Sequence, residues 1–383
     1  MNVVYSKEPF PKRVLSSIFL AGPTPRDYSV QDSWRPEALS ILEEMGYQGT
    51  VFVPEERSGP WDPATYERQV AWEWECLEAA DVICFWVPRN MDTMPALTTN
   101  VEFGRFVQSG KIVLGAPPDA QHVRYLSTML QEQQDRSTYT SLSQTLQACL
   151  TSIQNTLEQS QVDSLRVGGD AHIPLHIWST PTFQSWYAGM VHAGNQIRGA
   201  KVLWRHKDFA WALQVDVYVQ SENRIQDVEF VLSRTDLSSV LLYRRDQDPL
   251  SSECLLIEEF RTGVRNDIGK VRQLPGGSSE DTSDPFKTAL EELAEEVGLP
   301  IAPDRVKPHR GRQDHPTFGS QHTHLFSVEV SEEEMAQLRA DSSTNHGVGD
   351  ERISFHVRSY KELLQDPNLS WGTLGMLAEV LLG

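Results

Sequence analysis

The sequence is poor in cysteine and in long apolar runs, and both shortages limit what the protein can be. Its 383 residues include four scattered cysteines, with no close pair that would build a zinc site or a redox motif. We therefore expect reduced thiols in or near protein cores. No apolar run approaches the roughly 18 residues of a membrane span, and the N-terminus lacks a basic region followed by a long apolar segment. These absences favour a cytoplasmic protein with no membrane partner.

Basic residues are also scarce relative to acidic ones. The chain has 34 Lys and Arg against 53 Asp and Glu, which gives a net charge of -19. Such a surface repels the phosphate backbone, so we expect no nucleic-acid partner. Small phosphorylated substrates remain compatible with this charge, because a bound metal ion can reverse the field of a site. The length suggests at least two domains.

Strand-like and helix-like segments alternate in the first part of the chain. We expect strands over 17–21, 51–54, 81–87 and 111–115, and helices over 34–45, 66–80 and 101–109. This alternation predicts an α/β domain with a doubly wound parallel sheet, Rossmann-like or flavodoxin-like. Ligands of such sheets bind at the carboxyl ends of the strands.

The texture of the sequence changes after this domain. We assign residues 1–167 to the first domain and 168–200 to a linker or interface segment, because Gly168-Gly169 is the best candidate boundary. Residues 201–383 carry mostly strand-like segments joined by polar turns, with one helix rich in glutamate and a last helix near 373–382. This pattern predicts a second, α+β domain with a mixed sheet.

Three glutamates of the second domain suggest a metal site. Glu292, Glu295 and Glu296 stand at i, i+3 and i+4, so an α-helix would place three carboxylates on one face, where they repel one another unless a cation lies between them. Hard oxygen ligands suit Mg²⁺ or Mn²⁺. The plainer alternative is a solvated acidic face. Pro285 suits the first turn of the helix and Gly298 its C-terminal stop.

The segment from Gly277 to Leu299 resembles the Nudix box, G-x5-E-x7-R-E-U-x-E-E-x-G-U with U aliphatic, without insertion or deletion. The resemblance implies that the three glutamates hold Mg²⁺ against a diphosphate, where the ion neutralises charge and helps to orient the attacking water. Two positions depart from the box: Ser283 and Glu291 stand where the family has a glutamate and an arginine. Both members of an ion pair that braces the loop against the helix are thus lost together.

Two flanking segments resemble the Nudix branch that hydrolyses ADP-ribose and related nucleoside diphosphates. They are Glu259-Phe260-Arg261 and the run from Arg272 to Gly277. The resemblance implies that Arg261 and Gly277 lie at the substrate. Glu351, in a Gly-Asp-Glu loop before a strand, is our candidate for the general base.

A second constellation lies in the first domain. The segments 18–24, 72–81 and 97–105 together resemble the nucleoside 2-deoxyribosyltransferase family, including its branch of nucleotide N-glycosidases, over roughly residues 15–120. Glu102 matches the nucleophile of that family. A carboxylate below the anomeric carbon can stabilise or attack an oxocarbenium-like centre. The alternative for Glu102 is plain stabilisation of a helix N-terminus.

Further residues take roles from the same resemblance. Glu73 lies eight residues before Asp81, where the family often has an aspartate that orients the sugar or the nucleophile. Asp81 is a catalytic candidate or, equally, a strand-start residue that holds backbone amides. Gly22 and Pro23 let the backbone approach the sugar or a 5′-phosphate.

Two more residues have a structural and a functional alternative. Asn100 is first a helix cap and second a substrate contact. Trp86 packs in the core or stacks on a base.

Both halves together suggest a bifunctional hydrolase of small-molecule nucleotides. One site would split a nucleoside diphosphate derivative to a monophosphate, and the other would cleave the monophosphate to free base and sugar phosphate. A deoxyribosyltransferase with an independent Nudix activity is the first alternative, and a nucleotide-sensing or ADP-ribose-sensing protein with a catalytically weak Nudix domain is the second. Both families commonly self-associate, so we expect a homo-oligomer.

Overall fold

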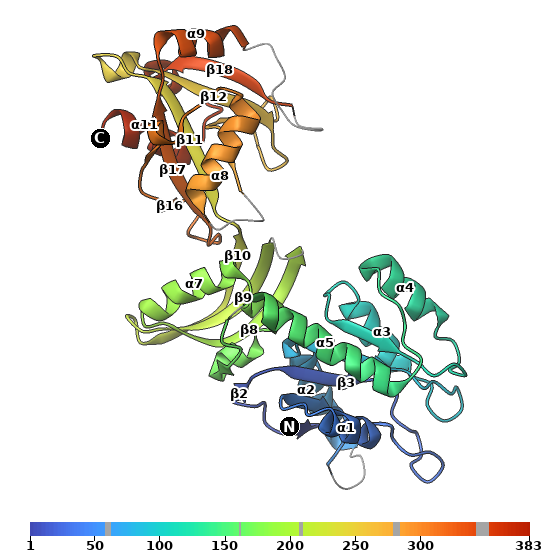
Figure 1. Cartoon of the computed structure of the whole chain (residues 1–383). Helices are drawn as coiled ribbons and strands as arrows, with labels where there is room; N and C mark the ends of the chain where they lie inside the picture. Colours follow the sequence, from blue (N-terminus) through green and yellow to red (C-terminus); the bar gives the residue numbers. More distant parts are fainter. Residues whose placement is uncertain (58–62, 161, 207–209, 279–283, 342–351) are drawn as a thin grey trace. The chain divides into compact units, whose positions relative to one another are not determined.

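The computed structural model describes residues 1–57, 63–160, 162–206, 210–278, 284–341 and 352–383. The chain divides into two compact units, Met1–Leu232 and Ser233–Gly383 (Figure 1). Each unit has its own sheets and its own apolar cores.

Five parallel strands form the main sheet of the first unit. Their order is β1 (Asn2–Tyr5), β4 (Thr50–Val53), β3 (Ser17–Ala21), β5 (Val82–Trp86) and β6 (Ile112–Gly115). The chain runs outward from β3 to β4 and then crosses back to β5, so the direction of winding reverses between β3 and β5. Open α/β sheets bind ligands outside the carboxyl ends of the strands at such a reversal. The predicted doubly wound parallel sheet is confirmed.

Side chains alternate between the two faces of this sheet, and each face has its own core. On β3, Phe19 and Ala21 face one core while Ile18 and Leu20 face the other. The first core is covered by α2 (Tyr66–Ala79), α3 (Leu97–Phe106) and α4 (Arg124–Gln134), and the second by α1 (Arg35–Glu44) and α5 (Leu142–Ser160). Because each fully buried large apolar side chain contributes about 1.5–3 kcal/mol, these two layers hold the sheet in place.

The first unit continues well beyond residue 167. Its later elements are β2 (Arg13–Val14) paired with β7 (Arg166–Val167), the 3-10 turns η1 (Pro63–Thr65) and η2 (Gly168–His172), α6 (Leu175–Trp178), α7 (Pro181–His192), and a three-stranded sheet of β8 (Gln196–His206), β9 (Ala210–Val219) and β10 (Arg224–Arg234). Trp178 and Phe183 from the helices bury themselves against Trp211 and Leu213 of β9. The predicted linker 168–200 therefore packs against strands that we expected in the second domain, and the division falls at residue 232 instead of 200.

The second unit is built on a mixed sheet, as predicted. Its strands are β11 (Leu237–Arg244), β12 (Glu253–Phe260), β13 (Lys270–Gln273), β14 (Gly276–Gly277), β15 (Lys307–Pro308), β16 (Arg312–Gln313), β17 (His322–Glu329) and β18 (Ser354–Ser359). The pair β11 and β17 is parallel, while β12 pairs antiparallel with β11, β13 and β18.

Helices cover both faces of the mixed sheet. One core lies under α8 (Pro285–Glu292), its π-helical continuation (Leu293–Val297) and α9 (Glu332–Ala340). The other lies under α10 (Tyr360–Leu363) and α11 (Trp371–Leu381), and short 3-10 turns occur at Pro249–Ser251 and Pro303–Arg305. The unit is therefore a sheet between two helical layers.

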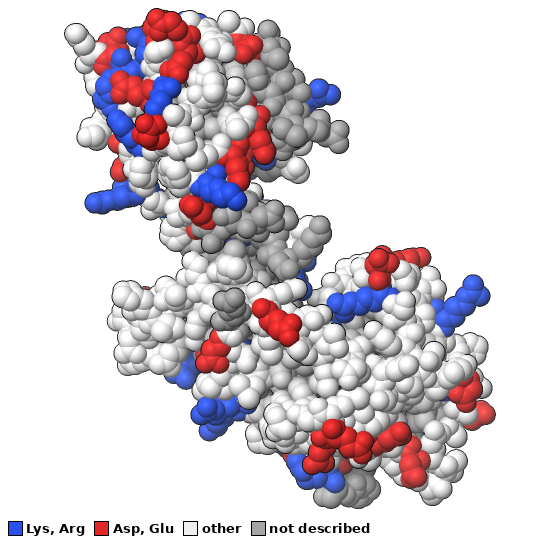
Figure 2. Space-filling view, in the orientation of Figure 1, with Lys and Arg blue, Asp and Glu red and all other residues white. Residues whose placement is uncertain are grey.

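All four cysteines are buried and unbridged. Of the helices in the described part of the chain, none is both long enough and apolar enough to cross a bilayer. On the face drawn in Figure 2, acidic and basic side chains lie interspersed over the second unit.

Candidate active site

Gly22 fixes the loop at the carboxyl end of β3. Its φ is +149°, and a Cβ there would lie 2.1 Å from the backbone oxygen of Trp86 at the end of β5. Only glycine allows this approach, which brings the two strand ends together at the reversal of the sheet. The Trp86 ring is buried in the core beneath α1 and α5, so the packing alternative fits its position and the predicted base stacking does not.

Arg35 ties this loop together and was missed by sequence reasoning. Its guanidinium donates to the backbone oxygens of Leu20 (3.1 Å) and Gly22 (2.8 Å), to that of Pro23 (3.4 Å), and to the carboxylate of Glu55 (2.6 Å). Arg35 is only 1% exposed. The sequence carried one signal of its role, because a cation in the first turn of a helix opposes the helix dipole and needs another reason to be there.

Glu102 lies on the buried face of α3, which it shares with Thr99, Phe103 and Phe106. It is 9% exposed, and no described residue donates a hydrogen bond to its carboxylate. Burial, with the negative charge of Glu73 in addition, raises the pKa of Glu102 to about 7, while the positive charge of Arg35 opposes the rise. A buried carboxyl group that titrates near neutrality is typical of functional sites.

Glu73 belongs to the same electrostatic group. It lies on α2, and its carboxylate accepts a hydrogen bond of 2.9 Å from Nε2 of Gln69. Burial raises the pKa of Glu73, and both the Gln69 contact and the charge of Arg35 oppose that rise. We call Gly22, Arg35, Glu73 and Glu102 the carboxyl-edge site. The structure thus brings together three of the residues that the sequence singled out.

Asn100 does not cap its helix. α3 begins at Leu97 after Ala96, which has a left-handed φ of 57°, so Asn100 falls inside the helix. Its Oδ1 accepts a hydrogen bond from Arg89, which also donates to the backbone oxygen of His122 at 2.8 Å. The predicted cap is therefore wrong, and Asn100 instead anchors the buried Arg89 of the loop after β5.

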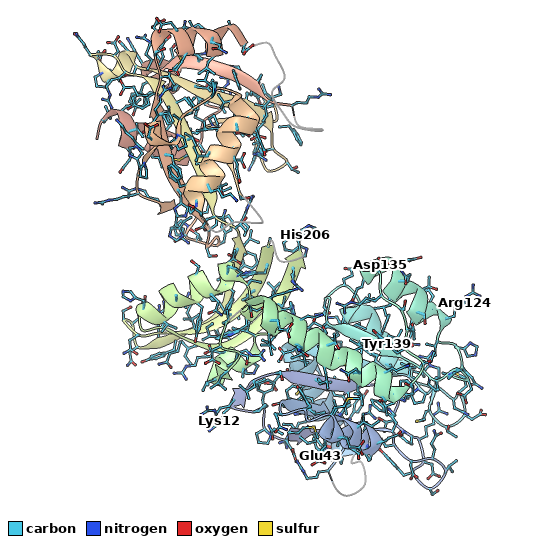
Figure 3. All side chains as sticks on the ribbon, viewed as in Figure 1. Lys12, Glu43, Arg124, Asp135, Tyr139 and His206 are labelled. Carbon is cyan, nitrogen blue, oxygen red and sulfur yellow. The ribbon has the colours of Figure 1, made fainter. Side chains whose placement is uncertain are left out.

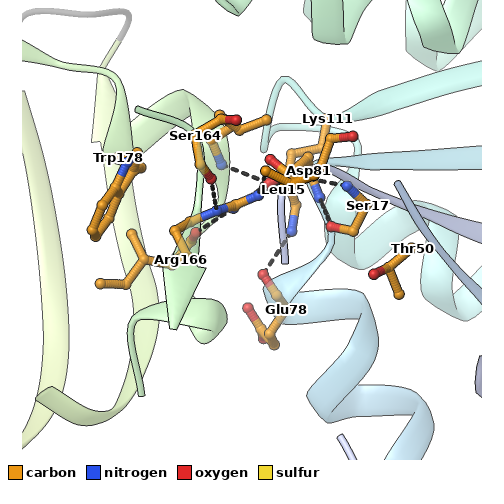
Figure 4. Close-up of polar contacts among 12 residues, drawn as sticks. Leu15, Ser17, Thr50, Glu78, Asp81, Lys111, Ser164, Arg166 and Trp178 are labelled. Atoms are coloured by element: carbon orange, nitrogen blue, oxygen red, sulfur yellow. Dashed lines mark hydrogen bonds and ion pairs between the residues drawn. The ribbon is translucent and has the colours of Figure 1, made fainter. Parts of the chain in front are cut away.

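Asp81 lies at the opposite end of the sheet, just before β5 begins. Its carboxylate accepts two hydrogen bonds from Arg166 (2.6 and 2.7 Å) and one each from the backbone amides of Ser17 (2.7 Å) and Leu175 (2.6 Å), as Figure 4 shows in part. Both side chains of the ion pair are almost fully buried. Of our two alternatives, the strand-start residue that holds backbone amides is the one that these contacts fit. Asp81 is not part of the carboxyl-edge site.

In the second unit, the Gly276-Gly277 turn meets the end of the glutamate-bearing helix. The turn pairs with β11, and the amide of Gly276 donates to Oε2 of Glu296 at 2.7 Å. A Cβ on Gly277 would lie 2.2 Å from Oε1 of Glu292. Glu292 and Glu296 therefore both face this turn. Pro285 lies in the first turn of the helix and Gly298 in the left-handed conformation at its end, as predicted, and the structure adds Asp284 as the N-cap.

Glu295 departs from the predicted arrangement. The helix widens to a π-helical turn over Leu293–Val297, closed by a bond of 3.1 Å from the Gly298 amide to the Leu293 oxygen. In such a turn the i, i+3, i+4 spacing of an α-helix no longer holds, and Glu295 is exposed while Glu296 is buried. Within the described ranges of the chain, no three His, Cys, Asp or Glu side chains are grouped closely enough to hold a metal ion.

The two departures from the Nudix box can be placed only in part. Glu291 is half-exposed and lies 3.5 Å from the ammonium of Lys287, one helical turn earlier. Its charge therefore projects outward and pairs along the helix. Ser283 and the predicted general base Glu351 both fall outside the described residues.

Arg261 and a second arginine lie near the glycine turn. Arg261 is half-exposed and pairs with Glu259, which also accepts 2.6 Å from Gln273. Arg234, at the end of β10, donates to the hydroxyl of Ser278 at 2.7 Å. Burial lowers the pKa of Arg234, and the charge of Arg261 lowers it further, so the two cations influence each other. Arg234 could not be predicted from the sequence, because no pattern around it indicates that it would contact Ser278 after the Gly276-Gly277 turn.

Comparisons with known proteins bear mainly on the first unit. The family described as nucleoside 2-deoxyribosyltransferase like matches residues 15–120, a stretch that includes Gly22, Glu73 and Glu102. No curated protein matches the chain. A solved structure described as "Crystal structure of ADP compounds hydrolase" is similar at 17% identity and a TM-score of 0.36, over 49% of this chain and 91% of that chain. Residues 15–120 are therefore a nucleoside 2-deoxyribosyltransferase-like region.

Proposed function

We propose that the first unit cleaves the N-glycosidic bond of a nucleoside or nucleotide, with Glu102 as nucleophile. The observation that carries the proposal is the state of Glu102: buried, without a hydrogen bond from the described residues, and with a pKa of about 7 at the carboxyl edge of a parallel sheet. The similarity of residues 15–120 to the nucleoside 2-deoxyribosyltransferase-like family supports it.

The chemistry follows from the charges of the site. A carboxylate oxygen of Glu102 bonds to the anomeric carbon as the bond from that carbon to the base breaks. The base leaves with the electron pair and takes a proton from the solvent, which the later attack of water returns. Water then attacks the anomeric carbon, which restores the carboxylate and releases the sugar or sugar phosphate. Because the positive charge of the transition state lies beside two buried carboxyl groups, it is stabilised more than the neutral substrate.

Glu73 and Arg35 have opposite effects on this carboxylate. Glu73 raises the pKa of Glu102, which favours a proton between the two acids in the empty site. Arg35 favours the ionised form of both, and its bonds to the Gly22 loop hold that positive charge in place. We infer that Glu73 orients the sugar or Glu102, and that Gly22 and Pro23 border the sugar.

The test follows free base released from a panel of nucleosides and nucleotides. Glu102→Gln should lower the rate at least about a thousandfold, the scale seen when a nucleophile is removed. Glu67→Gln, which changes an exposed glutamate of α2, is the matched control and should keep the wild-type rate. A glycosyl adduct in the intact mass of the wild-type protein, absent from Glu102→Gln, would identify the bond. Base release at the wild-type rate by Glu102→Gln would end the assignment.

Transfer instead of hydrolysis is the runner-up for this site. If a second base replaces water as acceptor, the same glycosyl adduct gives base exchange. Adding a labelled free base to the reaction separates the two: exchange without net loss of nucleoside favours a deoxyribosyltransferase.

For the second unit, we propose Mg²⁺-dependent cleavage of a nucleoside diphosphate derivative. The contact of Glu292 and Glu296 with the Gly276-Gly277 turn carries this proposal, and the nearby Arg234 and Arg261 supply positive charge for phosphate groups. Carboxylate oxygens are the donors that Mg²⁺ prefers, so the residues fit the ion chemically. We assign Glu292 and Glu296, which face the glycine turn, as its ligands, and the bound ion would neutralise phosphate charge. The predicted third ligand, Glu295, is exposed on the π-helical turn and is not grouped with them among the described residues.

The test for the second unit measures hydrolysis of ADP-ribose and related compounds with and without Mg²⁺. Glu296→Gln should abolish it and should leave base release by the first unit unchanged. Glu291→Gln, on the outward side of the same helix, should keep it. Saturable binding of ADP-ribose by the wild type with no turnover would instead favour a sensing role. If both units are active, the monophosphate from the second would be a substrate for the first.

A further inference from the structure

A cavity of about 300 Å³ lies at the amino edge of the parallel sheet, away from the carboxyl-edge site. Its walls come from the starts of β5 and β6, from α5 and α6, and from Arg205 near the end of β8. The five residues of β5 separate it from Gly22, a span of roughly 15 Å at about 3.3 Å per residue. The cavity and the carboxyl-edge site are therefore two different places in one unit.

The charges around this cavity are mostly positive, in a chain whose net charge is -19. Lys111, Arg136 and Arg205 line it, and Asp81 is the one acidic residue among the described residues of the lining. The carboxylate of Asp81 is already matched by Arg166. Three cations thus border the space, while the one acid among its described residues is paired with Arg166.

Backbone oxygens hold two of these cations in place, and the third lies beside Gly110. Lys111 donates to the oxygens of Leu77 and Glu78, both at 2.8 Å, and Figure 4 shows Lys111 beside Asp81. Arg136 donates to the oxygen of Ile112 at 3.1 Å, and a guanidinium nitrogen of Arg205 lies 3.4 Å from where a Cβ of Gly110 would be. Their positive charges are therefore ordered around one turn before any ligand binds.

The pKa of His176 reflects burial and the positive charge around the cavity. It lies on α6 in the lining, and its Nδ1 is buried with no hydrogen-bond partner among the described residues. Burial first, and then the charges of Arg205, Lys111 and Arg166, keep the pKa of His176 well below its usual range. A neutral imidazole with an open nitrogen beside three cations is a polar group that awaits a partner.

Hydroxyl groups complete the lining. Ser152, Thr156 and Ser160 of α5 border the cavity on one side and Thr180 on another. Thr156, Ser160 and Thr180 donate to backbone oxygens, so their hydroxyl oxygens remain as acceptors. Guanidinium groups are the donors that recognise a phosphate group, and hydroxyl oxygens suit the hydroxyls of a sugar. The volume is at the lower end of the range for small-molecule sites, and it exceeds what a bare phosphate needs.

We propose that this cavity, which we call the amino-edge site, binds the phosphate ester of a small sugar. Arg205 and Arg136 bind the phosphate oxygens and Lys111 adds charge beneath them. The hydroxyl oxygens of α5 and the open nitrogen of His176 bind the sugar hydroxyls. The proposal does not depend on the chemistry of Glu102.

The test uses ribose 5-phosphate as the probe, with inorganic phosphate and ribose for comparison. Calorimetry on the full chain should show saturable binding of ribose 5-phosphate that weakens with added salt, weaker binding of phosphate, and none of ribose. Hydrogen exchange should slow in Leu175–Trp178 and in the last turns of α5, which places the ligand at the amino edge and not at Glu102. Protection confined to the carboxyl edge, or no saturable binding, overturns the proposal.

Variants locate the phosphate. Arg205→Gln should weaken binding about tenfold or more, the effect of losing one charge-assisted contact, and Arg205→Lys should recover part of it. Arg124→Gln removes an exposed cation of α4, labelled in Figure 3, and should bind like the wild type. Thr156→Phe, which fills the cavity without a change of charge, should abolish binding if the chain stays folded. Equal weakening by Arg205→Gln and Arg124→Gln would mean general surface attraction only and would overturn the proposal.

Discussion

Asp81 and Glu102 are both buried carboxylates of the first unit and lie at opposite ends of one sheet. They differ in the hydrogen bonds that their carboxylates accept. Asp81 accepts hydrogen bonds from Arg166 and from two backbone amides. Glu102 receives none from the described residues, and its pKa rises to about 7. Burial alone therefore does not mark a functional acid. What distinguishes Glu102 is that none of the described residues donates a hydrogen bond to its buried carboxylate, a cost that a structural residue has no reason to carry.

The comparison predicts the largest effect at the matched acid. Asp81→Asn should destabilise the first unit by about 3–5 kcal/mol, because it leaves the buried guanidinium of Arg166 uncompensated. Denaturant unfolding followed by tryptophan fluorescence measures the change. Asp119→Asn, at an exposed aspartate of the same unit, should shift the midpoint little. A loss below about 1 kcal/mol for Asp81→Asn would contradict its anchoring role.

The unmatched acid should behave in the opposite way. The pKa of Glu102 is raised from 4.5 to about 7 in the folded state, so as the pH rises the unfolded chain releases this proton before the folded one does. The free energy of unfolding of the wild type therefore falls as the pH rises from about 4.5 to about 7. Glu102→Gln should therefore stabilise the protein at pH 8 by up to about 3 kcal/mol while it removes base release. Its stability curve against pH should also be flatter than that of the wild type. Destabilisation as large as that of Asp81→Asn would erase the contrast.

A smaller effect concerns the pH dependence of the proposed cleavage. Since the nucleophile must be ionised, kcat/KM for base release should rise with pH around the pKa of Glu102, near 7. Glu73→Gln removes the negative charge that raises this pKa, so the rise should move to lower pH. Glu67→Gln removes an exposed charge of the same helix and provides the comparison. An unchanged profile in Glu73→Gln would separate the two glutamates electrostatically.

The smallest effect is expected at the outward charge of the second unit. Glu291→Gln removes only the half-exposed pair with Lys287, so the free energy of unfolding should change by no more than about 0.5 kcal/mol. Thermal unfolding at low and high salt measures it, and salt should remove the difference. A change above about 1 kcal/mol would mean that Glu291 has a structural contact like the arginine of the Nudix box.

The parts of the fold that depend on simple periodicity were predictable. The apolar run 17–21 coincides with β3, and the predicted helix over 66–80 differs from α2 by one residue. The edge strand β1 was missed, because it has four residues and only one of them, Val4, is buried. The linker 168–200 was misjudged because its aromatic residues gave no sign of which sheet they would pack against.

Site residues could be predicted where they belong to a recognisable sequence motif. Gly22, Glu73 and Glu102 were named from the sequence, and the structure brings them to one edge of the sheet. Arg35 was missed since its partners are backbone oxygens, which no sequence pattern displays. The exposure of Glu295 was also beyond reach, because it follows from a single π-helical turn that the α-helical spacing of the glutamates does not reveal.

The anchor at Asp81 has a consequence for the order in which the protein is made. Its hydrogen-bond partners Arg166 and Leu175 leave the ribosome long after β3 and β5 do. The carboxylate of Asp81, which these partners bury, is therefore made well before them. Until they emerge, the nascent sheet holds a buried acid with no counter-charge, and its folding must wait. We expect a fragment that stops at residue 120 to stay unfolded even though it contains the whole deoxyribosyltransferase-like stretch. For this chain, the smallest part that can evolve or be transplanted as a folded piece is longer than the part that carries the family likeness.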